Sequence, residues 1–330
     1  MNTDPEHFAT TNHLSLITNH FSLRRAVIDI GTNSVKLLVA DVSPDATDPV
    51  WEGSEQTRLG RGFYEDHRLR PDAIADTARA VAHFVGVARE QGAASVRVIA
   101  TSAARDAVNA RELLDAVRSA SGHAVEVVSG EQEADWVFQG VLTEASLRSQ
   151  PVLILDVGGG STEFILGDAG RPVFRGSFKI GTVRMLESTP LSDPPTAAEL
   201  TAVRAQIREF LDREVRPQLA ARLKSMRQKG LTLVGTGGTT SILARLELRL
   251  PDYDRARIEA ACFTAERLRW HAEHLWQMPL AERRELPGLP ANRADVILFG
   301  VAIYEAVMET FGIATLRVST RGLRFAAVRA

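Results

Sequence analysis

Short apolar runs that end in glycine or polar residues recur along the chain, and they predict β-strands. Residues 26–30 and 35–42 are two such runs separated by four residues, a spacing that predicts a β-hairpin. Residues 151–155 and 164–166 flank a Gly-rich turn and predict a second hairpin. Five further runs predict the remaining strands, at residues 96–100, 125–128, 174–178, 231–235 and 315–319.

Apolar residues that recur every three to four positions predict helices between these strands. The clearest case is residues 71–91, where Ile74 and Val81 lie on one helical face. Pro71 near its start and Gly92 just past its end are typical of helix termini. Residues 251–292 are expected to form a helical subdomain with loops. The other predicted helices span about residues 101–119, 129–147, 197–214, 239–248, 293–312 and 322–328.

The alternation of strands and helices indicates the fold class. Helices between strands favour a parallel sheet, whereas the two hairpins add antiparallel strands, so we predict an α/β fold with mixed sheets in two halves. We place a mobile tail at residues 1–23, an N-terminal lobe at 24–139 and a C-terminal lobe at 140–330. The closing helix, at residues 322–328, is predicted to pack either within the C-terminal lobe or back on the N-terminal lobe. The polar tail lacks the pattern of a signal peptide.

The two predicted hairpins have similar sequences. DIGTNSVKLLVAD, from Asp29, aligns without a gap on DVGGGSTEFILGD, from Asp156, so we expect two related domains that each present a phosphate-binding turn. Because glycine has no Cβ atom, Gly158, Gly159 and Gly160 can take positive φ and let backbone N–H groups close on an anion. Asp156 is placed to hold a hydrated divalent cation beside it. An ordinary Gly-rich hairpin remains the alternative for either motif taken alone.

Two further segments carry candidate chemistry. LVGTGGT, residues 233–239, is a third Gly-rich turn after an apolar strand. Ser129 and Gln132 have the spacing of a capping box, which places Glu133 in the first turn of a helix. There the helix dipole favours the ionised carboxylate. Glu133 is therefore a candidate general base. The alternative is that its carboxylate only stabilises the N-terminus of the helix.

Composition excludes several classes of protein. The chain has 330 residues, 45% of them hydrophobic and 24% charged, which suits a globular protein of two domains. A net charge of −2 argues against non-specific nucleic-acid binding. The single cysteine, Cys262, excludes an internal disulfide, fits a reducing cytoplasm and is expected to be buried. No apolar run approaches the ~20 residues that span a bilayer, so we expect no membrane partner.

Six motifs in order resemble those of one family. The two Asp-Gly hairpins stand beside ATSAAR from Ala100, SGEQEA from Ser129, GTGGT from Gly235 and RADVI from Arg293. Over residues 24–329 the chain resembles the exopolyphosphatase / guanosine pentaphosphate phosphohydrolase (Ppx/GppA) family. The resemblance implies the two-lobed, actin-like (ribonuclease H-like) ATPase fold, with duplicated domains. Because the His-Asp motif of longer members is missing, it implies the short two-domain form.

The resemblance also implies the roles of individual residues. Glu133 is implied as the catalytic base and Arg105 as a catalytic, phosphate-contacting arginine. Asp156 and Glu163 match acidic positions that the family associates with Mg²⁺. Lys36 stands where the family often has arginine. The implied substrate-binding residues are Asp29, Gly31, Thr32, Asn33, Ser34 and Lys36, then Gly158, Gly159, Gly160, Ser161 and Thr162, and finally Gly235, Gly237, Gly238 and Thr239.

We therefore expect a Mg²⁺-dependent hydrolase that releases terminal phosphate from inorganic polyphosphate, guanosine pentaphosphate or both. Short polyphosphate chains are the expected polymer, and Glu133 is expected to activate water. One alternative is an actin-like kinase for a small metabolite, which needs an acceptor pocket and an adenine pocket. The other is a phosphate or nucleotide sensor without turnover. We expect a cytoplasmic homodimer that binds neither nucleic acid nor membrane.

Overall fold

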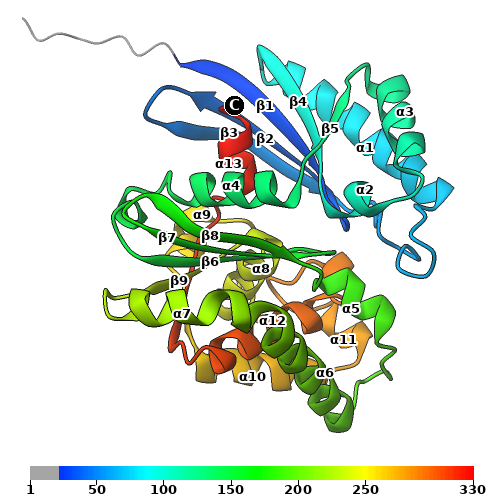
Figure 1. The fold of residues 1–330 in the computed structure, drawn as a ribbon. Helices are drawn as coiled ribbons and strands as arrows, with labels where there is room; N and C mark the ends of the chain where they lie inside the picture. Colours follow the sequence, from blue (N-terminus) through cyan, green and yellow to red (C-terminus); the bar gives the residue numbers. More distant parts are fainter. Residues whose placement is uncertain (1–21) are drawn as a thin grey trace, which may run out of the picture.

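The computed structural model describes residues 22–330, which form two lobes, each built on one mixed β-sheet (Figure 1). The tail predicted at residues 1–23 lies outside the described residues, except that Leu23 begins β1. The first sheet has the order β3 (Thr47–Glu55), β2 (Val35–Val42), β1 (Leu23–Ile30), β4 (Ser95–Ala100), β5 (Val125–Val127). The second has the order β10 (Cys262–Thr264), β11 (Thr315–Val318), β9 (Thr232–Thr236), β6 (Val152–Val157), β7 (Thr162–Asp168), β8 (Arg171–Phe178).

The two sheets repeat one arrangement, which confirms the predicted duplication. In the first, β1, β2 and β3 are antiparallel and β4 lies parallel to β1; in the second, β6, β7 and β8 are antiparallel and β9 lies parallel to β6. The register is also equivalent, because Asp29 pairs with Lys36 across the first hairpin and Asp156 pairs with Glu163 across the second. The two hairpins therefore bring their turns to equivalent places in the two lobes.

Alternating residues of the strands feed different cores. In β1, Ile28 faces the outer core of the first lobe and Val27 faces a core shared by both lobes; in β6, Leu155 and Ile154 divide in the same way.

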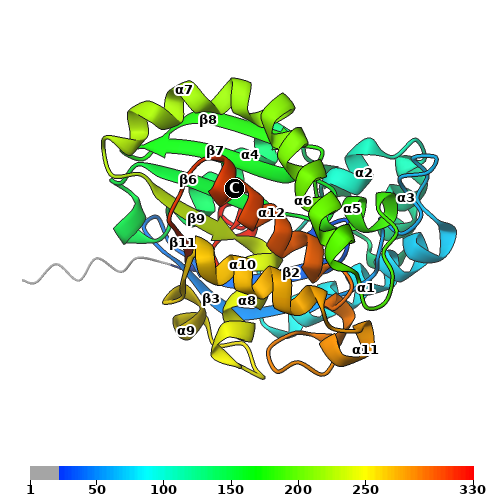
Figure 2. The same cartoon turned by 90° about the horizontal axis from the view of Figure 1, so that it is seen from below.

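The first lobe carries α1 (Pro71–Glu90), α2 (Ser102–Asp106) and α3 (Ala110–Ser121). The second carries α5 (Thr182–Ser188), α6 (Ala197–Phe210), α7 (Arg216–Arg227), α8 (Gly237–Leu248), α9 (Arg255–Glu259), α10 (Ala265–Trp276), α11 (Leu280–Arg283) and α12 (Ile297–Thr310), of which α6, α10 and α12 lie together in Figure 2.

Helices α4 (Gly130–Val141) and α13 (Leu323–Ala327) form a layer between the two sheets (Figure 1). Arg324 on α13 donates a hydrogen bond to the carbonyl oxygen of Leu37 in β2, at 2.8 Å. The closing segment thus binds the first sheet while its apolar side chains pack with α4. This layer holds the two lobes face to face.

Gly140 permits the close contact between α4 and the start of α13. A Cβ atom at this position would lie 2.0 Å from the carbonyl oxygen of Gly322, which is backbone and cannot rotate away. We therefore expect Gly140→Ala to destabilise the protein by about 2 kcal/mol, as overpacking of a core does. Urea unfolding measures this change. Gly86→Ala in α1 is the matched control, since nothing lies within 4 Å of the added methyl group, and equal stability of the two variants would contradict the interpretation.

Several predicted helix bounds were wrong. The helix of Glu133 ends at Val141 rather than near residue 147. The helix predicted to end at residue 214 continues to Arg227 through a π-helical segment, Leu211–Val215. The wider π turn accommodates Pro217, which lacks the N–H of a regular helix. Helix α12 begins at Ile297 rather than at residue 293.

Short elements escaped the analysis of periodicity. Helix α5 was not predicted, because its seven residues are too few to show a helical period. Strand β10 lies inside the segment expected to be helical. Cys262 was expected to be buried, but it is exposed on this edge strand, where the alternating position Phe263 turns inward instead.

Candidate active site

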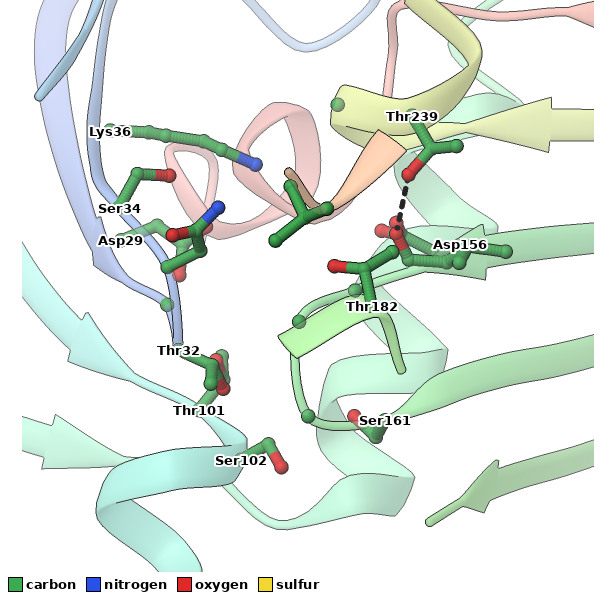
Figure 3. Close-up of a pocket in the computed structure, with 18 of the residues that line it drawn as sticks. Asp29, Thr32, Ser34, Lys36, Thr101, Ser102, Asp156, Ser161, Thr182 and Thr239 are labelled. Carbon is green, nitrogen blue, oxygen red and sulfur yellow. Dashed lines mark hydrogen bonds between the residues drawn. The ribbon is translucent and has the colours of Figure 1, made fainter. Parts of the chain in front are cut away.

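The two hairpin turns face each other across a cavity between the lobes (Figure 3). Asp29, Ser34 and Lys36 enter it from the first hairpin, and Asp156 and Ser161 enter it from the second. The equivalent positions of the turns in the duplicated sheets explain this arrangement, because stacking the two lobes face to face brings both turns to one cleft.

Most residues predicted for the site line this cavity. Thr162 lies outside it and donates a 2.6 Å hydrogen bond to the carbonyl oxygen of Ile180. Gly235 is packed within β9, Gly237 lines an adjoining cavity, and Arg105 lies behind Glu133. The predicted residues that line the main cavity are Asp29, Gly31, Thr32, Asn33, Ser34, Lys36, Glu133, Asp156, Gly158, Gly159, Gly160, Ser161, Glu163, Gly238 and Thr239.

The glycines of the second turn do not use the positive φ that glycine allows. Gly158, Gly159 and Gly160 do not take positive φ, whereas Gly237 does, at +85°. Gly159 and Gly160 instead allow the two lobes to approach each other closely, whereas a Cβ atom on Gly158 would meet the carbonyl oxygen of Ser161 in its own turn. A Cβ atom on Gly160 would lie 2.6 Å from Ser102 Oγ and 2.9 Å from Thr32 Oγ1. The missing side chains therefore let the turns meet.

Both turns present free backbone N–H groups. Within residues 22–330, the amides of Gly159, Gly160 and Ser161 donate no hydrogen bond to the protein. The same holds in that range for the amides of Thr32, Asn33 and Ser34. Runs of successive N–H groups that face a cavity are suited to binding an anion such as a phosphoryl group.

Glu133 is held at the edge of the cavity by the start of α4 and by Arg105. Ser129 caps the helix by accepting a 3.1 Å hydrogen bond from the Gln132 amide, although the return bond of the predicted capping box is not seen in the described chain. Arg105 donates to Glu133 Oε2 at 2.9 Å and to the carbonyl oxygen of Val128 at 3.1 Å. One guanidinium thus fixes both the carboxylate and the chain leading to its helix.

Burial raises the pKa of Glu133 to about 7, against the opposing charge of Arg105. The charges of Asp29 and Asp156 raise this pKa further. The helix dipole was expected to favour the ionised carboxylate, but desolvation in the cleft outweighs it. A carboxyl group that titrates near neutral pH is suited to accept a proton from water.

Asp29, Lys36 and Asp156 form a half-buried group of charges in the cavity. Burial raises the pKa of each aspartate and lowers the pKa of Lys36, and the Lys36 charge acts to lower both aspartate pKa values. Asp29 Oδ1 is buried and has no hydrogen-bond partner in the part of the chain that the structure describes. A buried, unpartnered carboxylate oxygen fits a position that receives a cation or a hydrated group.

Glu163 has a more enclosed place than Asp156. Its Oε1 accepts hydrogen bonds from Ser161 Oγ at 2.9 Å and Ser177 Oγ at 2.7 Å. Burial, followed by the charges of Glu133 and Asp156, holds its pKa well above the usual range. Among the described residues no group of three or more His, Cys, Asp or Glu side chains forms a metal cluster. The carboxylates of Asp29 and Asp156, which line the cavity, are ligands that suit Mg²⁺, since this ion takes one or two carboxylates and completes its shell with water and phosphate oxygens.

Four polar residues of the cavity were not predicted for the site. Thr101 and Ser102 follow β4 at the place that corresponds to the Gly237 turn after β9, so the duplication contained the signal that would have revealed them. Thr182 begins the unpredicted helix α5. Arg293 belongs to a quoted motif that had received no role; its buried guanidinium donates a 2.8 Å hydrogen bond to Ser34 Oγ in the opposite lobe.

A second cavity adjoins the first. Lys36, Gly238 and Arg293 line both, so the two spaces form one passage along the cleft. The second cavity is also lined by Arg245, Arg324 and Glu52, of which Arg324 and Glu52 form an ion pair at 3.4 Å. Cationic side chains thus continue beyond the site that would hold a single phosphoryl group.

The duplicated sheets and facing hairpin turns define a two-lobed protein of the actin-like class. The family model of the Ppx/GppA phosphatase family matches residues 38–326, and the chain belongs to this family. It is 35% identical to Exopolyphosphatase 2 of Mycobacterium tuberculosis, over 90% of this chain and 94% of that protein. The predicted family, the actin-like fold class and the enzyme class are thereby confirmed.

Solved structures agree with this assignment. The Aquifex aeolicus Ppx/GppA family member matches with a TM-score of 0.74 and 29% identity, over 93% of this chain and 97% of that one. An exopolyphosphatase from Cytophaga hutchinsonii matches with a TM-score of 0.79 and 25% identity, over 92% and 96%. Across residues 22–330 we also find no helix with the length and apolar character needed to cross a membrane.

Proposed function

We propose that this protein is an exopolyphosphatase that hydrolyses the terminal phosphoanhydride bond of inorganic polyphosphate. The main support is the position of Glu133, a buried carboxyl group with a pKa near 7, beside two facing turns with free N–H groups. A sensor that only binds phosphate has no need of a base there. Relatives that carry the name exopolyphosphatase over most of the chain support the same substrate class.

In the proposed reaction the terminal phosphoryl group lies between the turns and accepts hydrogen bonds from their amides. Glu133 takes a proton from a water molecule while the oxygen of that water bonds to the terminal phosphorus. The anhydride P–O bond breaks, and the shortened polyphosphate chain leaves with the electron pair of that bond. Arg105 keeps the Glu133 carboxylate in place. Asp156, with Asp29 and Glu163 beside it, would hold Mg²⁺, which when bound neutralises charge on the phosphate oxygens.

The second cavity suits the rest of a short chain. Arg245, Arg293 and Arg324 provide positive charge along it, and guanidinium groups bind phosphate oxygens well. We therefore propose short polyphosphate as the preferred polymer, with guanosine pentaphosphate as the other candidate, since it also ends in a phosphoanhydride. The cytoplasmic location, the homodimer and the lack of nucleic-acid binding stay predictions.

Phosphate release in parallel assays tests this proposal. Purified protein with Mg²⁺ is offered short polyphosphate, long polyphosphate, guanosine pentaphosphate and ATP, each with and without EDTA. Rapid release from short polyphosphate that EDTA abolishes is the expected result. Preference for ATP in the presence of a small metabolite would favour the kinase, and tight binding of polyphosphate without turnover would favour the sensor.

The pH profile should follow the deprotonation of Glu133. Because this group acts as a base only when ionised and its pKa is about 7, kcat/KM should fall about tenfold per pH unit below 7 and level off above it. Initial rates at subsaturating polyphosphate between pH 5 and pH 9 measure the profile. A rate that stays constant from pH 5 to pH 7 would contradict this role for Glu133.

A further inference from the structure

The amides of the second turn are oriented from behind by α5. The amide of Thr182 donates to the Gly158 carbonyl oxygen at 3.0 Å, and the amide of Val183 donates to that of Gly159 at 2.9 Å. The side chain of Arg184 donates from Nε to the carbonyl oxygen of Gly160 at 2.9 Å. In a trans peptide the C=O and the following N–H point in opposite directions. These bonds therefore direct the next three N–H groups away from α5.

The loop at residues 58–64 supports the first turn in the same way. The amide of Gly60 donates to the Thr32 carbonyl oxygen at 2.7 Å, and the amide of Arg58 donates to that of Asn33 at 3.1 Å. The N–H groups that follow these two carbonyls are consequently turned to the other side. Each turn thus depends on a neighbouring segment to aim its amides.

The two supports are joined across the lobes. Glu187 of α5 accepts a 2.5 Å hydrogen bond from the amide of Gly62 in the loop. The guanidinium of Arg184 lies over the ring of Tyr64, 4.2 Å from its centroid, a cation–π arrangement. Arg184 also lies 3.6 Å from Asp106 at the end of α2. Arg184 therefore contacts the first lobe with the same group that holds the Gly160 carbonyl of the second.

We propose that Arg184 and Tyr64 form an interlobe clamp that aims the Ser161 amide at the phosphoryl group. In this role both are positioning residues: Arg184 acts through the Gly160–Ser161 peptide, and Tyr64 acts by holding Arg184. The anion site of the second turn is then fully formed when the first lobe is in place against it. The inference rests on the proposed function for the identity of the ligand, a phosphoryl group. The clamp itself rests on the contacts of Arg184 and Tyr64 with the turns.

Four variants test the clamp. Arg184→Lys keeps the charge but loses the planar group that stacks and donates from Nε. Tyr64→Leu keeps apolar bulk and removes the ring face, whereas Tyr64→Phe keeps that face. Arg222→Lys is the matched control, since Arg222 lies over the ring of Phe174, 5.7 Å from its centroid, on a helix that does not line the cavity. Melting curves establish that each variant is folded.

Two readouts are measured, kcat/KM on short polyphosphate and the dissociation constant for inorganic phosphate by calorimetry. Arg184→Lys and Tyr64→Leu should each lower kcat/KM about 10- to 100-fold, because small misplacement of a binding group is costly. Each should weaken phosphate binding about tenfold, and Tyr64→Phe should restore most of both. The double variant should lose no more than the worse single one, because the two residues act as a unit.

The outcomes separate the clamp from the proposed function. The clamp would be overturned if the losses in kcat/KM of Arg184→Lys and Tyr64→Leu multiplied in the double variant. It would also be overturned if these two variants bound phosphate as tightly as Arg222→Lys does. A wild-type protein that binds phosphate but cleaves none of the substrates would overturn the proposed function. In that case the phosphate affinities of the variants would still decide for or against the clamp.

Discussion

Replacing Glu133 by glutamine should lower kcat about 10³-fold while leaving KM within a few-fold. Glutamine has nearly the same shape and can still meet Arg105, which now donates to the Glu133 carboxylate at 2.9 Å, but it cannot accept a proton from water. General base catalysis contributes roughly 10²- to 10⁴-fold to a rate, and what remains reflects the amides and charges of the cleft. Phosphate release under saturating short polyphosphate measures the change.

The experiment has an internal check on folding. Glu133 is buried with a raised pKa, so the ionised form is unfavourable in the folded protein above pH 7 and the glutamine variant should melt at least as high as the wild type there. An inactive variant with a normal or raised Tm therefore identifies a chemical loss. If kcat stayed within tenfold of the wild type at pH 8, Glu133 would not be the base.

The hairpins were predictable because their signal is local. Alternating apolar residues and the repeated Asp-Gly turns are written into residues 29–41 and 156–168, and the observed pairing of Asp29 with Lys36 and of Asp156 with Glu163 follows from that repeat. The residues of these turns that the family resemblance implied as substrate-binding line the cavity, apart from Thr162, because the same local pattern places both turns there. The duplicated fold class follows from the same local patterns, together with the helices between them.

Other features depend on contacts between distant segments and left little local signal. The pKa of Glu133 is set by burial and by the charges of Asp29 and Asp156 from other segments, so its position in a helix did not predict it. The glycines of the second turn were considered for their backbone conformation, yet at Gly159 and Gly160 what matters is the space left for Thr32 and Ser102 of the other lobe. Helix α5 has too few residues to show a helical period. Its hydrogen bonds to the carbonyl oxygens of Gly158 and Gly159 join segments that the sequence alone does not bring together.

Replacing Gly160 by alanine should reduce kcat/KM about 100-fold and should lower Tm less than Gly140→Ala does, because the clashing atoms are side-chain oxygens rather than backbone. The added methyl group would lie 2.6 Å from Ser102 Oγ, 2.7 Å from Tyr64 Oη and 2.9 Å from Thr32 Oγ1, all on the first lobe. Three short contacts cannot be relieved by one rotamer change, so the lobes must separate or the turn must shift. Misplacing the turn by about 1 Å can cost a factor of this size. Steady-state kinetics on short polyphosphate measures it.

The matched control is Gly86→Ala, which adds the same methyl group to an open position in α1. Because alanine favours a helix over glycine by about 1 kcal/mol, this variant should be slightly more stable and fully active. If Gly160→Ala also kept full activity, contact between the turns would not be needed for catalysis. A loss confined to Gly160→Ala would instead mean that the chemistry requires the two turns to touch, as expected if the three free amides of each turn bind one phosphoryl group together.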